Sequence, residues 1–252
     1  MTLPQDRAHY KLWAMLAELK TYRFIDLTHA FRPGIPHAID MPDEKRVILY
    51  DFEPDNFMAH KYEIAGQWGT HADPPIHFVR GGRRLDEIDV VEMIMPLVVF
   101  DVTKQVAANH DYSISLEDVK AWEARHGRIP DGAFAALRTD WSMRWPDAEA
   151  MANCDHEDVS HTPGWSVAAL EFLCTERNIG ACGHETGDTD PGVTVARDEF
   201  PAETYVLQQD KFQIELLTNL NQLPAAGAIV IAAFPKPEGG SGFPARVFAI
   251  AP

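Results

Sequence analysis

A short polar segment at residues 66–78 carries the side chains best suited to chemistry. It reads Gly-Gln-Trp-Gly-Thr-His-Ala-Asp-Pro-Pro-Ile-His-Phe. If residues 62–73 form an extended strand, side chains two positions apart share a face, so Gln67, His71 and Asp73 would point the same way. Amide, imidazole and carboxylate groups all bind metal ions. The spacing therefore predicts three donors that converge on one metal ion.

Glycine and proline are expected to shape this segment. Gly69 leaves room for an ion or a close backbone approach, and the two prolines after Asp73 end the strand rigidly, so that His77 can fold back over the site. The alternative is an ordinary structural hydrogen bond between His71 and Asp73. A core strand would not favour a glutamine, two histidines and an aspartate so close together, because such groups are costly to bury. We therefore favour a site.

A second polar cluster occupies residues 183–192 and reads Gly-His-Glu-Thr-Gly-Asp-Thr-Asp-Pro-Gly. It is not an EF-hand loop, because Pro191 interrupts it, its glycine stands at the wrong position and no helices flank it. His184-Glu185 lacks the second histidine of the His-Glu-x-x-His zinc motif. Two interpretations stay open, a solvated turn held by Asx-type hydrogen bonds and a loop that lines the site.

Other catalytic motifs are missing from the sequence. It holds no Gly-x-Ser-x-Gly elbow, no P-loop and no Gly-x-Gly-x-x-Gly fingerprint, and no cysteine stands in a nucleophile-like context. A serine or cysteine nucleophile is therefore disfavoured. A metal-activated water is the attacking group that the sequence offers.

The remaining pattern predicts the elements that must position these residues. Helices are expected at residues 5–20 (within an N-terminal segment 1–22), at 115–127 with Ser115 as the cap, and at 166–180. Short apolar runs bounded by proline, glycine or aspartate predict strands at residues 46–50, 97–102, 134–138, 212–217, 228–234 and 246–250. Several runs are apolar throughout, which is typical of strands covered on both faces.

The order of these elements indicates the fold class. Strands and helices do not alternate evenly, as they would in a doubly wound sheet or a β/α barrel. No repeat and no low-complexity linker divides the chain. We therefore expect a single α/β domain, residues 1–252, built on a central mixed β-sheet.

Composition excludes several classes of function. The chain has 38 acidic and 22 basic side chains, a formal charge of −16, which disfavours nucleic acid and anionic membranes as partners. The three cysteines form no Cys-x-x-Cys pair and are expected to be unpaired thiols in a reducing compartment. Neither a signal-peptide pattern nor a run of about 18 apolar residues is present. We expect a soluble, cytoplasmic protein that acts on a small molecule.

The polar segment resembles the hallmark of the metal-dependent cyclase and kynurenine formamidase superfamily, His-x-Gly-Thr-His-x-Asp-x-Pro-x-His-Phe. Residues 67–78 match it at every fixed position except the first, where Gln67 replaces histidine. Further similarity spans most of the chain, at residues 25–28, 137–141, 200–202, 214–215, 219–220 and 242–246.

This resemblance implies a swivelling β/β/α-type (cyclase-like) fold, a homodimer or larger assembly, and roles for individual residues. His71 and Asp73 match metal ligands, and Glu215 matches a carboxylate that closes the site from a distant strand. His77 matches the histidine that moves protons during amide hydrolysis. Together with Gln67, the first three residues form the expected ligand set.

Two departures from the family pattern bear on the metal and the substrate. Gln67 replaces the first ligand histidine, and Glu203 stands where the family usually has another, twelve residues before Glu215. Replacing imidazoles with oxygen donors favours a single Mn²⁺ over the two-zinc site of the formamidases, with Zn²⁺ as the alternative. These features are most similar to the isatin hydrolase branch of the superfamily, which opens a cyclic amide fused to an aromatic ring.

The resemblance therefore implies hydrolysis of a C–N amide bond in a small aromatic substrate, with isatin to isatinate as the leading reaction. Trp68, His184 and Glu203 are the expected substrate contacts, and core packing is the alternative for Trp68. Hydrolysis of N-formylkynurenine is the rival within the same chemistry, although it expects the two missing histidines. A noncatalytic protein that binds an aromatic ligand is the alternative of another class.

Overall fold

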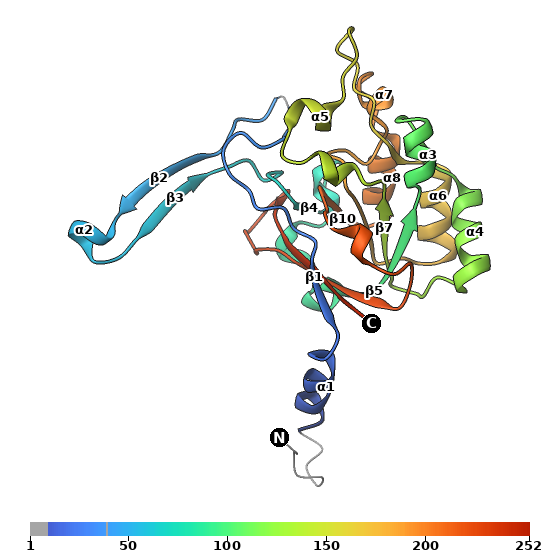
Figure 1. Cartoon of the computed structure of the whole chain (residues 1–252), viewed down its shortest axis with the longest axis horizontal. Helices are drawn as coiled ribbons and strands as arrows, with labels where there is room; N and C mark the ends of the chain where they lie inside the picture. The colour runs from blue at the N-terminus through green and yellow to red at the C-terminus, as the bar shows by residue number, and fades with distance from the viewer. Residues whose placement is uncertain (1–9, 39) are drawn as a thin grey trace.

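A nine-stranded mixed sheet forms the centre of the molecule in the computed structural model, which describes residues 10–38 and 40–252 (Figure 1). The middle of the sheet, from β5 to β10, is parallel, and both flanks are antiparallel. This architecture confirms the predicted α/β fold. In spatial order, the strands are β1 (Arg23–Asp26), β13 (Arg246–Ala251), β11 (Ala228–Ala233), β5 (Ile94–Asp101), β7 (Phe134–Arg138), β9 (Ala181–His184), β10 (Phe212–Glu215), β4 (His71–Asp73) and β12 (Phe243–Pro244).

Two small sheets and a set of mostly short helices complete the described chain. The small sheets pair β2 (Lys45–Tyr50) with β3 (Ala59–Glu63), and β6 (Ser113–Ile114) with β8 (Gly164–Trp165). No helix in the described ranges has the length and hydropathy needed to cross a membrane. The helices are α1 (Lys11–Leu19), α2 (Phe52–Asp55), α3 (Thr103–Ala108), α4 (Leu116–His126), α5 (Ala148–Ala152), α6 (Val167–Glu171), α7 (Gly192–Val195) and α8 (Pro201–Gln208).

Strand β5 shows how the central sheet separates two apolar cores. Val98 and Phe100 pack in one cluster with Val119 of α4, on the face where Figure 1 shows α3, α4, α6 and α8. Leu97 and Val99 belong to a second cluster on the opposite face. Because successive side chains of a strand point to opposite faces, this unbroken apolar run is covered on both sides, as the sequence predicts.

The predicted strands agree with the structure except around the polar segment. Strand β7 has the predicted ends, and β5, β10, β11 and β13 differ from the predictions by a few residues. The expected extended strand over residues 62–73 is wrong, because β3 ends at Glu63, a loop follows, and β4 covers only His71–Asp73. This loop turns at Gly69, whose φ of +62° is a conformation that glycine adopts without strain.

The predicted helices are confirmed with shorter bounds. Helix α1 covers part of its prediction, and residues 5–9 of that prediction lie outside the described residues. Helix α4 begins directly after Ser115 and ends before Gly127, as expected. Helix α6 begins after Ser166 and continues as a π-helical turn at Phe172–Glu176, so this segment ends before the predicted Gly180.

A capping box holds the start of α4. The Ser115 hydroxyl accepts a hydrogen bond from the Asp118 backbone N–H at 3.1 Å, and the Asp118 carboxylate accepts one from the Ser115 N–H at 2.8 Å. We expect Ser115→Ala to lower the free energy of unfolding by about 1 kcal/mol in urea titrations, because it leaves a helix N–H without its acceptor. Ser115→Thr keeps the hydroxyl and should retain most of the stability. Equal losses in both variants would contradict this role of the cap.

Candidate metal centre

Strands β4 and β10 bring distant parts of the chain together. They pair antiparallel, with His71 opposite Glu215 and Asp73 opposite Gln213. Side chains alternate along each strand, so Ala72 enters the second apolar core while its polar neighbours share the other face. The pairing of β4 with β10 thus brings together donor residues that lie far apart in the sequence.

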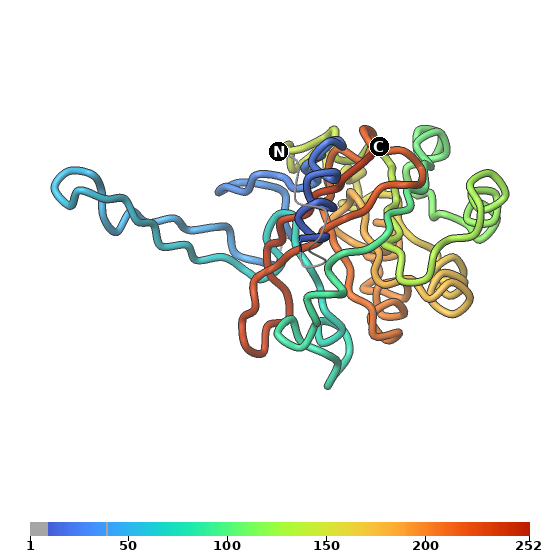
Figure 2. The backbone as a smooth tube through the Cα atoms, turned by 90° about the horizontal axis from the view of Figure 1, so that it is seen from below, coloured from blue at the N-terminus to red at the C-terminus, as the bar shows by residue number. Residues whose placement is uncertain are grey.

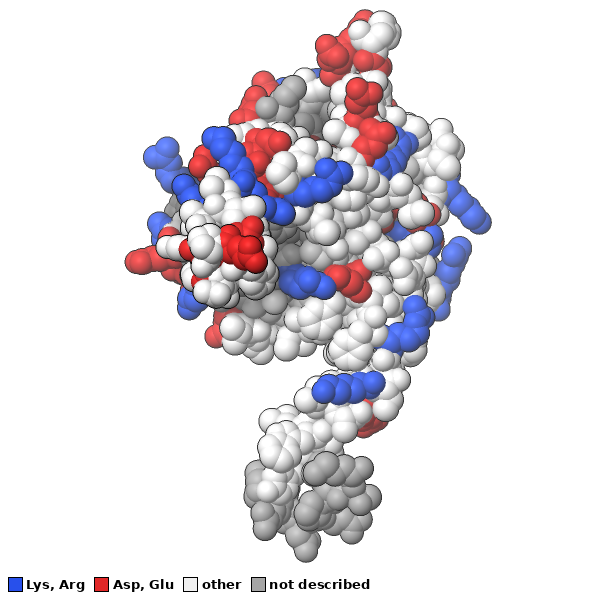
Figure 3. Space-filling view, turned by 60° about the vertical axis from the view of Figure 1, so that its left-hand side comes forward, with Lys and Arg blue, Asp and Glu red and all other residues white. Residues whose placement is uncertain are grey.

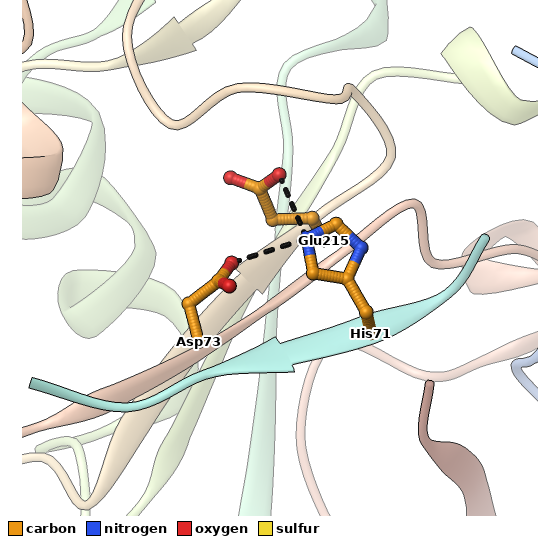
Figure 4. Close-up of side chains that lie close together, drawn as sticks. All are labelled: His71, Asp73 and Glu215. Carbon is orange, nitrogen blue, oxygen red and sulfur yellow. Dashed lines mark ion pairs between the residues drawn. The ribbon is translucent and has the colours of Figure 1, made fainter. Parts of the chain in front are cut away.

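His71 is the centre of the first group of donors. Its Nε2 lies 3.2 Å from Asp73 Oδ2 and 3.4 Å from Glu215 Oε2, and all three residues are buried (Figure 4). The other ring nitrogen, Nδ1, lies 2.7 Å from the carbonyl oxygen of Gly69 and is held as a donor to it. Nε2 has no hydrogen-bond partner among the described residues. This nitrogen and the two carboxylates therefore surround one position that a cation can fill.

The electrostatics at His71 favour a positive charge at that position. Burial lowers the pKa of His71, but the charge of Asp73 and its contact with the ring outweigh burial and raise it. The same pair lowers the pKa of Asp73 to about 2, although burial alone would raise it. Either a proton or a metal ion can supply this positive charge. A divalent ion neutralises more of the negative charge of the surrounding carboxylates than a proton does.

A second group of donors shares Asp73. His77 follows the two prolines in a 3-10 turn, and its Nε2 lies 3.9 Å from Asp73 Oδ1 and 3.9 Å from Glu203 Oε1. Glu203 is a buried residue of α8. The His77 side chain is 24% exposed, in contrast to the buried carboxylates around it. The structure thus places the predicted proton-transfer residue beside the predicted ligands, on the side that solvent reaches.

Gln67 reaches the centre from the loop before β4. Its Nε2 donates hydrogen bonds to Asp73 Oδ1 and to the carbonyl oxygen of Ser241, both at 3.1 Å. A Cβ at Gly242 would overlap this amide and press on Asp73, so a larger residue there would displace the Gln67 amide from this position. The oxygen of Gln67 would face the centre after half a turn of the amide group. Its role as a metal ligand stays a prediction.

Gln213 is a buried residue that links two carboxylates by hydrogen bonds, and the sequence pattern was not used to predict it. Its Nε2 donates to Glu203 Oε1 at 2.9 Å and to Glu215 Oε1 at 3.1 Å, while its Oε1 accepts from the Thr189 hydroxyl at 2.6 Å. It lies two positions before Glu215 in β10, on the same face. Polar residues at alternating positions of an otherwise apolar strand are the signal that could have identified it.

Buried carboxylates crowd the centre. Burial and neighbouring carboxylates raise the pKa of Glu203 and of Glu215 well above the ordinary range, and the same causes raise the pKa of Asp188 to about 6. In the described part of the chain, only histidine side chains lie within ion-pairing distance of Glu203 and Glu215. Negative charges gathered in a buried site need a cation to neutralise them. The residues present therefore fit a divalent metal ion.

His184 ends β9 and lies against the same carboxylates. It is fully buried, its Nε2 lies 3.4 Å from Glu215 Oε1, and burial lowers its pKa to about 3. Neither ring nitrogen has a hydrogen-bond partner among the described residues. His184 is thus a neutral imidazole with unsatisfied nitrogens next to the donor group. A contact with substrate stays a prediction.

The polar loop at residues 183–192 lines the site, which decides between the two interpretations of its sequence. Thr189 and Asp190 are buried, and a solvated turn would expose them. The Asp190 carboxylate accepts hydrogen bonds from the backbone N–H groups of Ala202 and Glu203, at 2.9 and 3.0 Å. These contacts satisfy the first turn of α8 and fix where Glu203 stands.

Trp68 lies below the surface of the molecule. It is fully buried, its ring centroid lies 4.8 Å from that of His37, and its Nε1 has no hydrogen-bond partner within the described ranges. Such burial favours the core-packing alternative. Its contact with substrate stays a prediction.

Comparison with known proteins identifies the family. The model of the cyclase family, described as "Putative cyclase", matches residues 25–191. The chain belongs to the cyclase family. This cyclase-family chain is 37% identical over 242 residues to an isatin hydrolase from Roseibium aggregatum, across 90% of this chain and 91% of that protein.

Solved structures support the same relationship. An isatin hydrolase bound to the product analogue thioisatinate has a TM-score of 0.90 and 32% identity, over 98% of this chain and 99% of that chain. Isatin hydrolase A from Ralstonia solanacearum has a TM-score of 0.89 and 34% identity, over the whole of both chains. A protein from Bacillus stearothermophilus described as a "predicted metal-dependent hydrolase", at 23% identity and a TM-score of 0.66, shows that the fold is shared more widely.

The crowding of carboxylates predicts opposite effects of one substitution with and without metal. In metal-free protein at neutral pH, we expect Glu215→Gln to raise the melting temperature by several degrees. The buried carboxyl must either carry an uncompensated negative charge or bind a proton, whereas the amide of the same shape needs neither. About 1 kcal/mol corresponds to roughly 2–4 °C in a domain of this size. Excess Mn²⁺ should stabilise the unsubstituted chain more than the variant and reverse the order.

Differential scanning calorimetry with and without Mn²⁺ measures this reversal. Glu123→Gln is the matched control. Glu123 is a residue of α4, pairs with Arg177 and takes no part in the donor groups of the centre. Its effect should be the same with and without metal. A Glu215→Gln variant that is less stable than the unsubstituted chain in both conditions would show that the carboxylates do not repel one another.

Proposed function

We propose that this chain is a metal-dependent hydrolase that opens the cyclic amide of isatin to give isatinate. The observation that carries the proposal is the buried group of His71, Asp73 and Glu215 around an unpartnered imidazole nitrogen. It lies in a chain that is 37% identical to an isatin hydrolase across 90% of its length. A relative crystallised with a product analogue supports the same substrate class.

We propose a single Mn²⁺ as the cofactor, with Zn²⁺ as the alternative. His71 Nε2 and the carboxylates of Asp73 and Glu215 would hold the ion, joined by Gln67 through its side-chain oxygen. One imidazole among several oxygen donors suits Mn²⁺ better than a histidine-rich or thiolate site would. When bound, the ion activates a water for attack on the amide carbon and polarises the carbonyl.

His77 is proposed to move protons during the reaction. Its Nε2 faces Asp73 and Glu203 at 3.9 Å, and its partly exposed ring borders the open side of the centre. Imidazole can accept a proton from the attacking water and return one to the leaving nitrogen. Burial lowers the pKa of His77 although the charge of Asp73 opposes the shift, and this favours the neutral ring that can accept a proton.

The substrate contacts are proposed to include Glu203, His184 and Trp68. Glu203 is the best placed, because it adjoins His77 and its position is fixed by the loop before α8. His184 has two ring nitrogens without partners in the described chain, which suits a polar contact. Trp68 is fully buried, so its ring would form an apolar wall for the substrate only if the residues that cover it move.

We also propose that the chain is cytoplasmic and works as a homodimer or larger homo-oligomer. All three cysteines are free, and Cys174 and Cys182 are buried, as expected for a protein of a reducing compartment. The assembly is what the family resemblance implies.

Comparing two substrates tests the proposed reaction. We expect isatin turnover with Mn²⁺ to exceed N-formylkynurenine turnover by at least about tenfold in kcat/KM, a difference of about 1.4 kcal/mol in transition-state stabilisation. Activity with Zn²⁺ in place of Mn²⁺ should be lower. Preference for N-formylkynurenine would favour the formamidase alternative. Binding of isatin without turnover under any divalent metal would favour the noncatalytic one.

Two histidine variants separate metal binding from proton transfer. We expect His71→Ala to lose bound metal and activity together, because it removes the nitrogen donor. His77→Ala should keep its metal, measured by elemental analysis, and lose about 100- to 10,000-fold in kcat, the usual contribution of a general base. His156→Ala, at an exposed position, is the control and should change neither. Full activity in His77→Ala would rule out its proton-transfer role.

A further inference from the structure

The side chain of Gln213 lies wholly inside the body of the molecule. Its strand, β10, is bordered by β9 on one side and by β4 on the other, where Gln213 stands opposite Asp73. Figures 1 and 2 show the hairpin of β2 and β3 projecting from the body, while this part of the central sheet lies within it. Gln213 is 0% exposed, so neighbouring protein groups rather than bulk solvent determine how its amide is oriented.

Hydrogen bonds fix the orientation of the Gln213 amide from both ends. At the oxygen end, Oε1 accepts a hydrogen bond from the Thr189 hydroxyl at 2.6 Å. At the nitrogen end, Nε2 donates to Glu203 Oε1 at 2.9 Å and to Glu215 Oε1 at 3.1 Å. An amide nitrogen carries two hydrogens, so these two contacts use both of them. Turning the amide over would place its oxygen against carboxylate oxygens, which donate no hydrogen when they are ionised.

The two oxygens of Glu215 consequently face different neighbours. Oε1 accepts the hydrogen bond from Gln213 and lies 3.4 Å from His184 Nε2. Oε2 lies 3.4 Å from His71 Nε2, beside the position that a cation can fill. A carboxylate can bind a metal ion through one oxygen or through both. In this chain the Gln213 amide already engages one of the two.

Glu203 is held by the same amide on the other side of the centre. Its Oε1 accepts the second hydrogen bond from Gln213 and lies 3.9 Å from His77 Nε2. Two like charges at such close range repel one another, and a donor placed between them lets both keep a fixed position. The Gln213 amide thus joins the carboxylate beside His71 to the carboxylate beside His77.

Lysine and arginine side chains do not take over this task. On the face shown in Figure 3, the basic side chains stand on the outer surface of the molecule. Among the described residues, only histidine side chains lie within ion-pairing distance of Asp73, Glu203 and Glu215. A neutral amide suits this position, because it donates hydrogen bonds and adds no positive charge that would repel a metal ion.

We propose that Gln213 is a positioning residue of the metal centre, which engages Glu215 Oε1 so that Oε2 alone is presented to the ion. The proposal rests on the metal-dependent hydrolase proposed above and adds a residue that controls its ligands. Through Glu203, the same amide ties the metal-binding side of the centre to the side that carries His77. Removing a group that orients a metal ligand typically weakens metal binding by about 10- to 100-fold.

Gln213→Met tests this role, because methionine fills a similar volume and donates no hydrogen bond. With Mn²⁺ alone as the probe, we expect the Kd from calorimetric titration to rise by about 10- to 100-fold. In the variant saturated with Mn²⁺, the electron paramagnetic resonance spectrum should also change, because Glu215 Oε1 is then free to turn toward the ion. Gln105→Met is the matched control, since Gln105 of α3 donates to Asp118 at 3.4 Å, and it should change neither measurement.

Two substitutions of Thr189 separate the orientation of the amide from packing. Thr189→Val keeps the side-chain shape and removes the hydroxyl that holds Gln213 Oε1, so we expect the Kd for Mn²⁺ to rise by about 3- to 10-fold, the effect of losing one hydrogen bond. Thr189→Ser keeps the hydroxyl and should restore most of the affinity. Equal losses in both variants would show that packing supports the site and would contradict the proposal.

Circular dichroism checks that each variant is folded, and the Thr189 pair decides the question if Gln213→Met is not. Unchanged Mn²⁺ affinity and an unchanged spectrum in folded Gln213→Met overturn the proposal, and the proposed reaction still stands if the unsubstituted chain hydrolyses isatin. The expected changes in a chain that does not hydrolyse isatin support this role of Gln213 and overturn the reaction instead. An unsubstituted chain that binds no Mn²⁺ overturns both.

Discussion

Repulsion between buried carboxylates is the constraint on which the rest of the site depends. Asp73, Glu203 and Glu215 lie within one small volume, and among the described residues only histidine side chains lie within ion-pairing distance of them. In a low-dielectric interior such charges are stable only with a compensating cation or with bound protons. The hydrogen bonds from Gln213 offset part of the repulsion but supply no charge. The fold therefore keeps a position that a divalent metal ion can fill.

The backbone around the centre fixes its donors at several independent points. The register of β4 against β10 places His71 beside Glu215, and the loop at residues 183–192 fixes Glu203 through Asp190. Glycine at position 242 leaves room for the Gln67 amide. Because these supports come from distant segments, the site forms only in the folded chain. Metal binding should accordingly stabilise the whole domain.

Sequence reasoning predicted the site better near the motif than across the sheet. His71 and Asp73 share a face, as alternation predicts, even though the strand that carries them is only three residues long. Glu215 was accessible only through the family resemblance, because antiparallel pairing between segments over 140 residues apart leaves no local pattern. Gln213 was also missed, although it alternates with Glu215 on one face of an otherwise apolar strand. The strand predicted at residues 46–50 corresponds to β2, but no sequence pattern showed that it lies outside the central sheet.

Anomalous diffraction from crystals grown with excess Mn²⁺ tests the central claim most directly. We expect one strong peak per chain, within coordination distance of His71 Nε2 and of the carboxylates of Asp73 and Glu215. A second peak of equal strength between His77 and Glu203 would contradict a single-metal centre. The absence of any peak beside His71 would contradict the assignment of this buried group as a metal site.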